Sequence, residues 1–288
     1  MDQQHETGDT RPRSASGAAA SGADTITERW AISEGQSRVI DLDAVTSLRV
    51  GIVGGSVDIV AHDEPTARVE VHRVEGRDLT VTLEQGRLSI SHPRMSWDDV
   101  WQSVKALVGV RAKVELSILV PRHVVLSLGQ VSASALVTGL GSRASLSTVS
   151  GPIQVASHRG DLELNTVSGD IEVSGGAGRL SVHGVSANVT ASGELTELGI
   201  DTVSGEVLLD VHGAPRSITV NSVSADITVR LDAGQGVRAT TRTVSGRGTI
   251  VGRAVPKRGG SEVVDGADVF PLSANTVSGS VTVMRRDA

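Results

Sequence analysis

Apolar residues recur at fixed offsets along most of the chain. One copy of the pattern has apolar residues at offsets 0, 2, 5, 9 and 11, namely Leu162, Leu164, Val167, Ile171 and Val173. The same register starts again at Leu48, Leu126, Leu180, Leu198, Ile218, Ala239 and Leu272. Two apolar residues that flank one polar residue are typical of a β-strand with one buried face. Each copy therefore predicts a strand, a corner, a second strand and a second corner, with all five apolar side chains facing the core.

A short motif marks the first corner of each copy. Val-Ser followed by Gly or Ala occurs eight times, with the valine at 131, 149, 167, 185, 203, 223, 244 and 277. The first four steps between these valines are 18 residues each, and the next three are 20, 21 and 33 residues. Equal steps with a shared motif indicate an internal repeat, in which each unit packs on its neighbours.

A single unit is too small to fold alone. Ordering 18 residues costs about 27 kcal/mol at about 1.5 kcal/mol per residue, while burying five aliphatic side chains returns only about 10 kcal/mol. Backbone hydrogen bonds to adjacent units must supply the rest, as in a solenoid. The pattern predicts an all-β protein, a single-stranded β-solenoid of 18-residue coils stacked in sequence order. We expect the solenoid domain to span residues 37–286 and residues 1–36 to form a disordered tail.

The serine of the motif is interpreted as a structural corner residue. At one coil per repeat, the hydroxyls of successive corners stack in a column and can bond along it or to the corner backbone. The residue after the serine is Gly five times and Ala three times, so the corner needs a small side chain rather than a positive φ angle. The serines with this predicted role are Ser150, Ser168, Ser186, Ser204 and Ser224.

One segment departs from the repeat. Residues 96–109 begin with a sequence that resembles a helix N-cap and have apolar side chains at helical spacing, namely Trp97, Trp101, Val104 and Val108. These residues predict a short helical insertion. Two interpretations remain open: the helix packs on the flank or end of the solenoid, or its tryptophans contact a partner or a membrane surface.

Composition and charge restrict the function. The chain is 39% hydrophobic and 21% charged with a net charge of -6, which is typical of a folded protein and gives no support for nucleic-acid binding. Aromatic residues make up only 1%, and there are no cysteines to form disulfides or thiolate metal sites. The sequence shows neither a secretory signal nor a membrane span, so we expect a cytoplasmic location.

Enzymatic and metal-binding repeats with similar coil lengths fit poorly. A hexapeptide-repeat acyltransferase needs an aliphatic residue every six positions, but Val167 and Val173 are followed by Arg179. A calcium-binding β-roll needs an Asp in its glycine-rich turn, and Gly178 is followed by Arg179 and Leu180. Eight equivalent serines cannot all be nucleophiles. We expect no catalytic residues, no cofactor and no metal site.

The repeat resembles the bacterial "toastrack" family of adhesin-like proteins, a domain of unknown function. The resemblance rests on the TVSG units that begin at Thr166, Thr202 and Thr276, on the early unit Val53-Gly54-Gly55-Ser56-Val57, and on the strand that ends in Val120-Pro121. It covers residues 37–286. It implies a non-enzymatic domain of the kind associated with envelope-stress systems and membrane-anchored partners.

Three hypotheses about function follow. The first is a non-enzymatic scaffold or interaction module with a protein partner, linked to the cell-envelope stress response and brought to the membrane by that partner. The second is an exported adhesin-like surface module, and the third is a β-helix acyltransferase. No small-molecule substrate is evident. Exposed end coils also provide a route to self-association.

Overall fold

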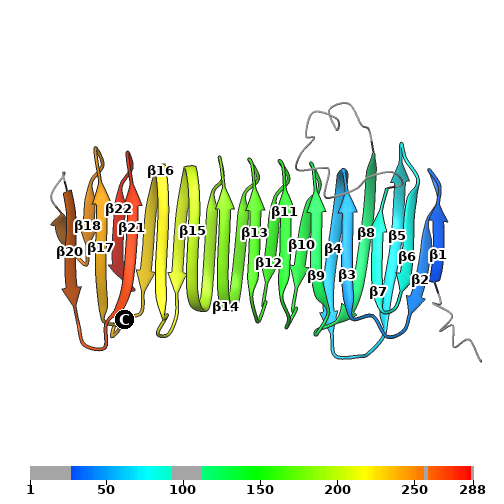
Figure 1. Cartoon of the computed structure of the whole chain (residues 1–288), viewed down its shortest axis with the longest axis horizontal. Helices are drawn as coiled ribbons and strands as arrows, with labels where there is room; N and C mark the ends of the chain where they lie inside the picture. Colours follow the sequence, from blue (N-terminus) through cyan, green and yellow to red (C-terminus); the bar gives the residue numbers. More distant parts are fainter. Residues whose placement is uncertain (1–26, 93–111, 256–258, 287–288) are drawn as a thin grey trace, which may run out of the picture.

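A computed structural model describes residues 27–92, 112–255 and 259–286, and every element in this part of the chain is a β-strand. The strands stack into a long rod (Figure 1). The predicted all-β solenoid is therefore confirmed. The predicted helix at 96–109 lies outside the described residues.

The strands form two faces of the rod. Three long strands, β14 (Ile171–Gly184), β15 (Val189–Val211) and β16 (Ser217–Leu231), bend around the corners and contribute to both faces. In stacking order, the first face contains β1 (Thr27–Ile32), β6 (Leu79–Glu84), β7 (Arg87–Ser91), β3 (Ser47–Ile52), β9 (Val125–Gln130), β11 (Ala144–Thr148), β13 (Leu162–Thr166), β14 to β16, β21 (Phe270–Thr276), β17 (Val237–Thr243) and β20 (Gly259–Asp265).

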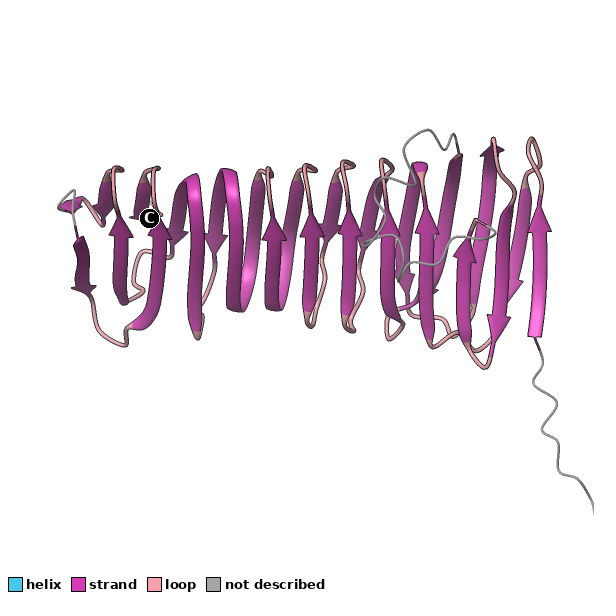
Figure 2. Ribbon diagram, turned by 45° about the horizontal axis from the view of Figure 1, so that its top comes forward, coloured by secondary structure: helices cyan, strands magenta, loops and turns pink. Residues whose placement is uncertain are grey.

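The second face runs parallel to the first, and turns join the two along the long edges of the rod (Figure 2). Its strands, again in stacking order, are β2 (Arg38–Leu42), β5 (Ala67–Glu75), β8 (Lys113–Pro121), β4 (Gly54–His62), β10 (Ser134–Thr138), β12 (Ile153–Ala156), β14 to β16, β22 (Val281–Arg285), β18 (Gly248–Ile250) and β19 (Arg253–Val255).

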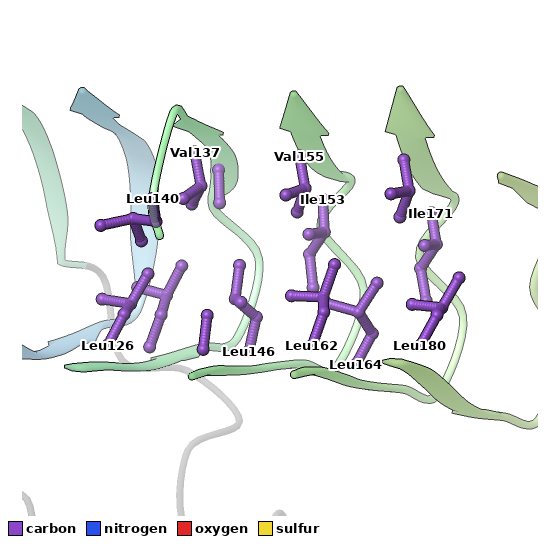
Figure 3. Packing of buried hydrophobic residues seen from close by; sticks show 14 of the residues in the cluster. Leu126, Val137, Leu140, Leu146, Ile153, Val155, Leu162, Leu164, Ile171 and Leu180 are labelled. Carbon is purple, nitrogen blue, oxygen red and sulfur yellow. The ribbon is translucent and has the colours of Figure 1, made fainter. Parts of the chain in front are cut away.

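Equivalent aliphatic side chains lie over one another between the two faces. Leu162 pairs in register with Leu180, and Leu180 pairs with Leu198. All three are at most 4% exposed. Across the rod the second face supplies the matching column, which includes Ile153 and Ile171 (Figure 3). The core is therefore a thin aliphatic layer that needs no aromatic side chains to fill it.

The ends of the rod differ from its middle. Parallel pairing runs through the middle, but the N-terminal end is closed by antiparallel pairs of β1 with β6 and of β2 with β5. The predicted tail is wrong for residues 27–36, because β1 belongs to the sheet. Ile32 is fully buried and Trp30 packs against the core, which anchors this strand.

The coils do not stack in sequence order at the C-terminal end. The last coil, β21 and β22, lies between β16 on one side and β17 and β18 on the other. The prediction of a strictly sequential stack is wrong here. The reason lies in the apolar content of the two copies. The last one presents Leu272, Ala274 and Val281 to the core, whereas the paired residues of its neighbour are Ala239, Thr241 and Gly248. The more apolar coil occupies the inner place, where it is covered on both sides.

The chain between these two coils makes the interleaving possible. Its strands β20 and β19 pair antiparallel with β17 and β18 at the end of the rod, and the chain then crosses beneath β17 to start β21. The crossing is tight at Gly236, where a Cβ atom would lie 1.9 Å from the carbonyl oxygen of Ala267. Only a glycine allows the crossing segment to pass this close.

The N-terminal end is interleaved in the same way. Strand β3 lies between β7 and β9, and β4 lies between β8 and β10, although β7 and β8 follow β4 in the sequence. At the N-terminal end an earlier coil, β3 and β4, is thus enclosed by a later one, whereas at the C-terminal end a later coil, β21 and β22, is enclosed by an earlier one. The regular 18-residue coils from β9 to β15 occupy the middle.

Candidate functional site

The threonine of the TVSG corner, rather than the valine, faces the core. Thr166 is 4% exposed and continues the inward series of Leu162 and Leu164. Its Oγ1 atom accepts a hydrogen bond of 2.8 Å from the backbone N–H of Gly169. The same bond measures 3.0 Å from Gly151 to Thr148 and 2.9 Å from Gly246 to Thr243. The threonine hydroxyl therefore stabilises the turn from inside.

The valine of the motif points outward, which corrects the prediction that it is buried. Because side chains alternate along a strand, the residue after an inward threonine must face solvent. The five valines at the C-terminal side of the rod are 46–65% exposed: Val185, Val203, Val223, Val277 and Val244. The three before them, Val131, Val149 and Val167, are half-buried.

These eight valines form one continuous row along an edge of the rod, which we call the valine ridge. In stacking order its members are Val131, Val149, Val167, Val185, Val203, Val223, Val277 and Val244. Backbone hydrogen bonds join neighbouring corners, such as Val277 N–H to the carbonyl of Val223 at 3.1 Å and Val244 N–H to that of Val277 at 3.2 Å. Seven steps of about 4.8 Å give the ridge a length of about 34 Å.

The corner serines lie beside the ridge. The Oγ atoms of Ser150 and Ser168 each donate a hydrogen bond of 3.2 Å to the valine carbonyl of the preceding coil. Ser204 Oγ lies 3.4 Å from the carbonyl oxygen of Val185 and 3.3 Å from Ser186 Oγ, and its single proton is shared between these two acceptors. Ser224 lies in the same row and is exposed. The structure thus brings all five predicted corner serines together, and most of these hydroxyls are occupied by the neighbouring coil.

The corner requires a small residue after the serine. A Cβ atom on Gly151 would lie 1.6 Å from the carbonyl oxygen of Ala133, and one on Gly246 would lie 1.7 Å from that of Gly279. Neither glycine has a positive φ angle, whereas Gly205 does, at 129°. Close approach between coils is therefore the common requirement. The close approach keeps every corner on this edge equally short, so no loops interrupt the ridge between Val131 and Val277.

Two polar rows flank the valine ridge. The first-face row consists of the residues before each corner threonine or its equivalent: Gly129, Ser147, Asn165, His183, Asp201, Asn221, Asn275 and Arg242. The second-face row consists of the residues after each small corner residue: Ser134, Pro152, Asp170, Asn188, Glu206, Asp226, Ser280 and Arg247.

Side chains in both rows bond to their neighbours along the rod. In the first-face row, Asn221 donates to Asp201 at 2.9 Å, and Asn275 donates to Asn221 at 2.9 Å. His183 Nδ1 lies 3.3 Å from an oxygen of Asp201. In the second-face row, hydrogen bonds from the backbone and hydroxyl of Ser280 lower the pKa of Asp226 below its ordinary value. These contacts fix the polar side chains as ordered borders of the ridge.

Shallow hollows lie between the ridge and the first-face row. One, of about 440 Å³, is lined by Asn165, His183, Val167 and Val185. A second, also of about 440 Å³, is lined by Asn221, Asn275, Val244 and Val277. Both are open grooves with an aliphatic wall and a polar wall, a form suited to binding an elongated partner.

The opposite edge of the rod is charged rather than apolar. Glu197 forms ion pairs with Arg216 at 2.6 Å and Arg179 at 2.8 Å, and Arg143 pairs with Glu163 at 3.2 Å. The hydrogen bond from Arg216, followed by the charge of Arg179, lowers the pKa of Glu197. Within the described residues, the tight-corner edge carries an exposed valine on each of five successive coils, and that edge is the candidate binding site.

A buried histidine in a second corner makes the stability depend on pH. His158 is 2% exposed and stands 18 residues after the buried Leu140. Neither ring nitrogen has a hydrogen-bond partner of standard geometry among the described side chains and backbone. Burial lowers the pKa of His158 below 6.5, although the backbone of Asp161 partly opposes this. The unfolded chain therefore takes up a proton on acidification before the folded one does.

We expect the free energy of unfolding to fall as the pH drops below 6.5, because the pKa of His158 is lowered on folding. The slope contributed by one histidine is at most about 1.4 kcal/mol per pH unit. Urea titrations at pH 7 and pH 5.5 should show a smaller loss for His158→Leu than for the wild type. The exposed His123 provides a matched control, since His123→Leu should keep the wild-type loss. Equal losses in both variants would contradict this role of His158.

The other sequence-predicted site residues are not tested by this geometry. Trp97, Trp101, Val104 and Val108 lie outside the described residues. No group of His, Asp and Glu arranged to hold a metal ion occurs in residues 27–92, 112–255 and 259–286. Over the same ranges, no helix has the length and apolar character required to cross a membrane. Sequence reasoning missed the valine ridge because it grouped the corner valine with the inward apolar residues.

Comparison with known families agrees with the architecture. A family model described as Toastrack DUF4097 matches residues 45–284, which is most of the chain. The chain belongs to the Toastrack family. The resemblance drawn from the TVSG units is therefore confirmed. The family is a domain of unknown function, so membership gives this Toastrack chain a fold but no activity.

Two solved structures resemble the chain over most of its length, and the one with the higher TM-score shows the same fold. A "putative lipid binding protein" from Parabacteroides distasonis is 15% identical, with a TM-score of 0.51, and the match covers 88% of this chain and 98% of that one. A "putative cell adhesion protein" from Clostridium sporogenes is 10% identical, with a TM-score of 0.30, over 87% of this chain and 99% of that one. No curated protein sequence matches the chain. At 15% identity the likeness to the Parabacteroides distasonis structure concerns the fold alone.

Proposed function

We propose that this Toastrack chain is a non-catalytic scaffold that binds a protein partner along the valine ridge. The observation that carries the proposal is the in-register exposure of Val185, Val203, Val223, Val277 and Val244, each 46–65% exposed. Contiguous apolar surface bordered by polar residues is typical of interaction sites. Fully burying a valine is worth about 1.5–3 kcal/mol, so covering each half-exposed valine returns roughly half of that.

The fold itself does not require valine at these positions. The inward threonine and the corner serine make the hydrogen bonds that hold the turn. A β-branched residue suits the extended backbone, but threonine would meet that need without exposing two methyl groups. The motif nevertheless places valine at the outward position in eight coils. A binding role explains this choice better than corner stability does.

The proposed setting follows from the family resemblance. A membrane-associated protein of a cell-envelope stress system is the proposed partner, with the chain acting on the cytoplasmic side. An exported adhesin-like module would use the same ridge outside the cell. Fractionation of the source cells separates the two, since the adhesin alternative requires surface-exposed protein.

Replacing two central ridge valines tests the binding role. Val185→Asp/Val203→Asp should abolish partner binding, because two charges would have to be desolvated in the interface. The fold should persist, since both side chains are about half exposed. The measurement is affinity capture from cytoplasmic and membrane fractions of the source cells, followed by mass spectrometry of the retained proteins.

A control variant carries the same charges away from the ridge. Thr190 and Thr219 are exposed on the second and first faces, so Thr190→Asp/Thr219→Asp adds two carboxylates without touching the ridge. We expect this control to retain every protein that the wild type retains. Identical sets of retained proteins for the wild type and the ridge variant would remove the ridge from the function.

A further inference from the structure

The repeat of the valine ridge restricts what can lie along it. Its valines recur with the coil spacing of about 4.8 Å. A helix presents a side chain about every 5.4 Å along its axis, so seven steps put it out of register by about 4 Å. A second solenoid ridge has the same spacing and stays in register over its whole length. A second copy of this chain carries such a ridge, with the same eight valines.

We propose that two copies pair ridge to ridge in an antiparallel arrangement, with each valine of one copy facing a valine of the other. The proposal deepens the scaffold function, because it names the second copy as one partner of the ridge. The two-fold axis lies between the corners of Val185 and Val203, midway along the eight coils. The first coil of the ridge in one copy then faces the eighth coil in the other copy, the second faces the seventh, and so on.

Charge favours the antiparallel arrangement over the parallel one. In the antiparallel pair the first-face rows meet, so His183 of one copy faces Asp201 of the other. In a parallel pair the first-face row meets the second-face row of the same coil. Asp201 would then face Glu206 of the second copy, which sets like charges together at the centre.

The arginines at the last coil support the same choice. Arg242 and Arg247 flank Val244 on its two sides, and both are exposed. A parallel pair would bring Arg242 of each copy against Arg247 of the other. In the antiparallel pair they face the corner of Val131, where the flanking residues are Gly129 and Ser134. The one like-charge contact left is Asp170 with Asp226, and Asp226 is held by two hydrogen bonds from Ser280.

The ridge is narrow, so the association should be reversible. A single row of valines and the two rows beside it bury less surface area than the extended flat interfaces of obligate dimers. We therefore expect a monomer–dimer equilibrium that depends on protein concentration. Replacing the valines should shift it toward the monomer.

Sedimentation equilibrium of the full chain tests the dimer. The wild type and Thr190→Asp/Thr219→Asp should dimerise with the same dissociation constant, while Val185→Asp/Val203→Asp should stay monomeric at the highest concentration reached. A wild type that is monomeric throughout, or a ridge variant that dimerises like the wild type, would overturn the proposal. Partner capture can still depend on the ridge in that case, so the scaffold function would survive.

Single cysteines test the arrangement, because the chain has none of its own. Oxidising a mixture of Val131→Cys and Val244→Cys proteins should give a covalent heterodimer, since these corners face each other in the antiparallel pair. Each variant alone should give little, because its two thiols lie about 34 Å apart, seven coil spacings. Covalent homodimers of each variant alone would indicate a parallel pair, and no covalent heterodimer in the mixture would equally rule out the antiparallel one.

Discussion

Removing residues 270–288 is expected to unfold the coil formed by β17 and β18 as well, although the deletion does not remove any of its residues. Strand β17 pairs with β21, and β18 pairs with β22, so neither pairs with β16 in the described fold. Without β21 and β22, the strands of residues 237–265 keep only the antiparallel pairs β17–β20 and β18–β19. Such isolated hairpins are marginally stable at best.

Amide hydrogen exchange measures this effect. In the truncated chain the amides of β17 and β18 should exchange at nearly unprotected rates, while those of β11 and β13 stay protected. Met284→Ala in the full chain is the control, because Met284 is an exposed residue of β22 and its loss should change little. Wild-type protection of β17 in the truncated chain would show that it can dock on β16 directly.

Shortening one core leucine is expected to have the largest effect of any single substitution considered. Leu180 is 1% exposed and lies between Leu162 and Leu198 in the column. Leu180→Ala should lower the free energy of unfolding by about 2–5 kcal/mol, because it removes a buried side chain and leaves a cavity. Each coil contacts only its neighbours, so the loss of protection should be greatest in the coils of these three leucines.

The adjacent serine provides the comparison. Ser181 follows Leu180 on the same strand but points outward, so Ser181→Ala should change stability by no more than about 0.5 kcal/mol. Urea unfolding followed by circular dichroism measures both variants. Similar midpoints for Leu180→Ala and Ser181→Ala would mean that the leucine column is not the core.

The sequence predicted the coil and its register well, because strand periodicity depends only on which side chains are buried. The spacing of Leu162, Leu180 and Leu198 was enough to place them over one another. The valine was misassigned because an apolar residue at a corner was taken as a core residue. Strict alternation from Leu162 through Leu164 to Thr166 would have placed Val167 outside.

The order of the coils could not be read from the repeat. Every copy carries the same strand pattern, so any copy can pair with any other through the backbone. Selection among them depends on the length of the connection and on how apolar the copies are. The long connection from Ile250 to Leu272 permits the last coil to pack on β16, inside the coil that precedes it in the sequence. The larger aliphatic content of the last coil favours this inner place.

The candidate site was harder to predict than the fold. A binding ridge made of one valine per coil carries no catalytic motif, and its residues belong to the repeat that builds the scaffold. Only the burial of Thr166 and the exposure of Val185 separate the two roles. The polar rows beside the ridge become visible once His183, Asp201 and Asn221 are known to stack.

The order of corners along the ridge can be measured directly with pairs of cysteines in the otherwise cysteine-free chain. Val223 and Val277 belong to adjacent coils, which lie about 4.8 Å apart. The coils of Val223 and Val244 are separated by two coil spacings, about 9.6 Å. A disulfide needs Cα atoms within roughly 4.4–6.8 Å. Oxidation of dilute protein should close an intramolecular disulfide in Val223→Cys/Val277→Cys and not in Val223→Cys/Val244→Cys. The reverse result would contradict the interleaved stack and the ridge built on it.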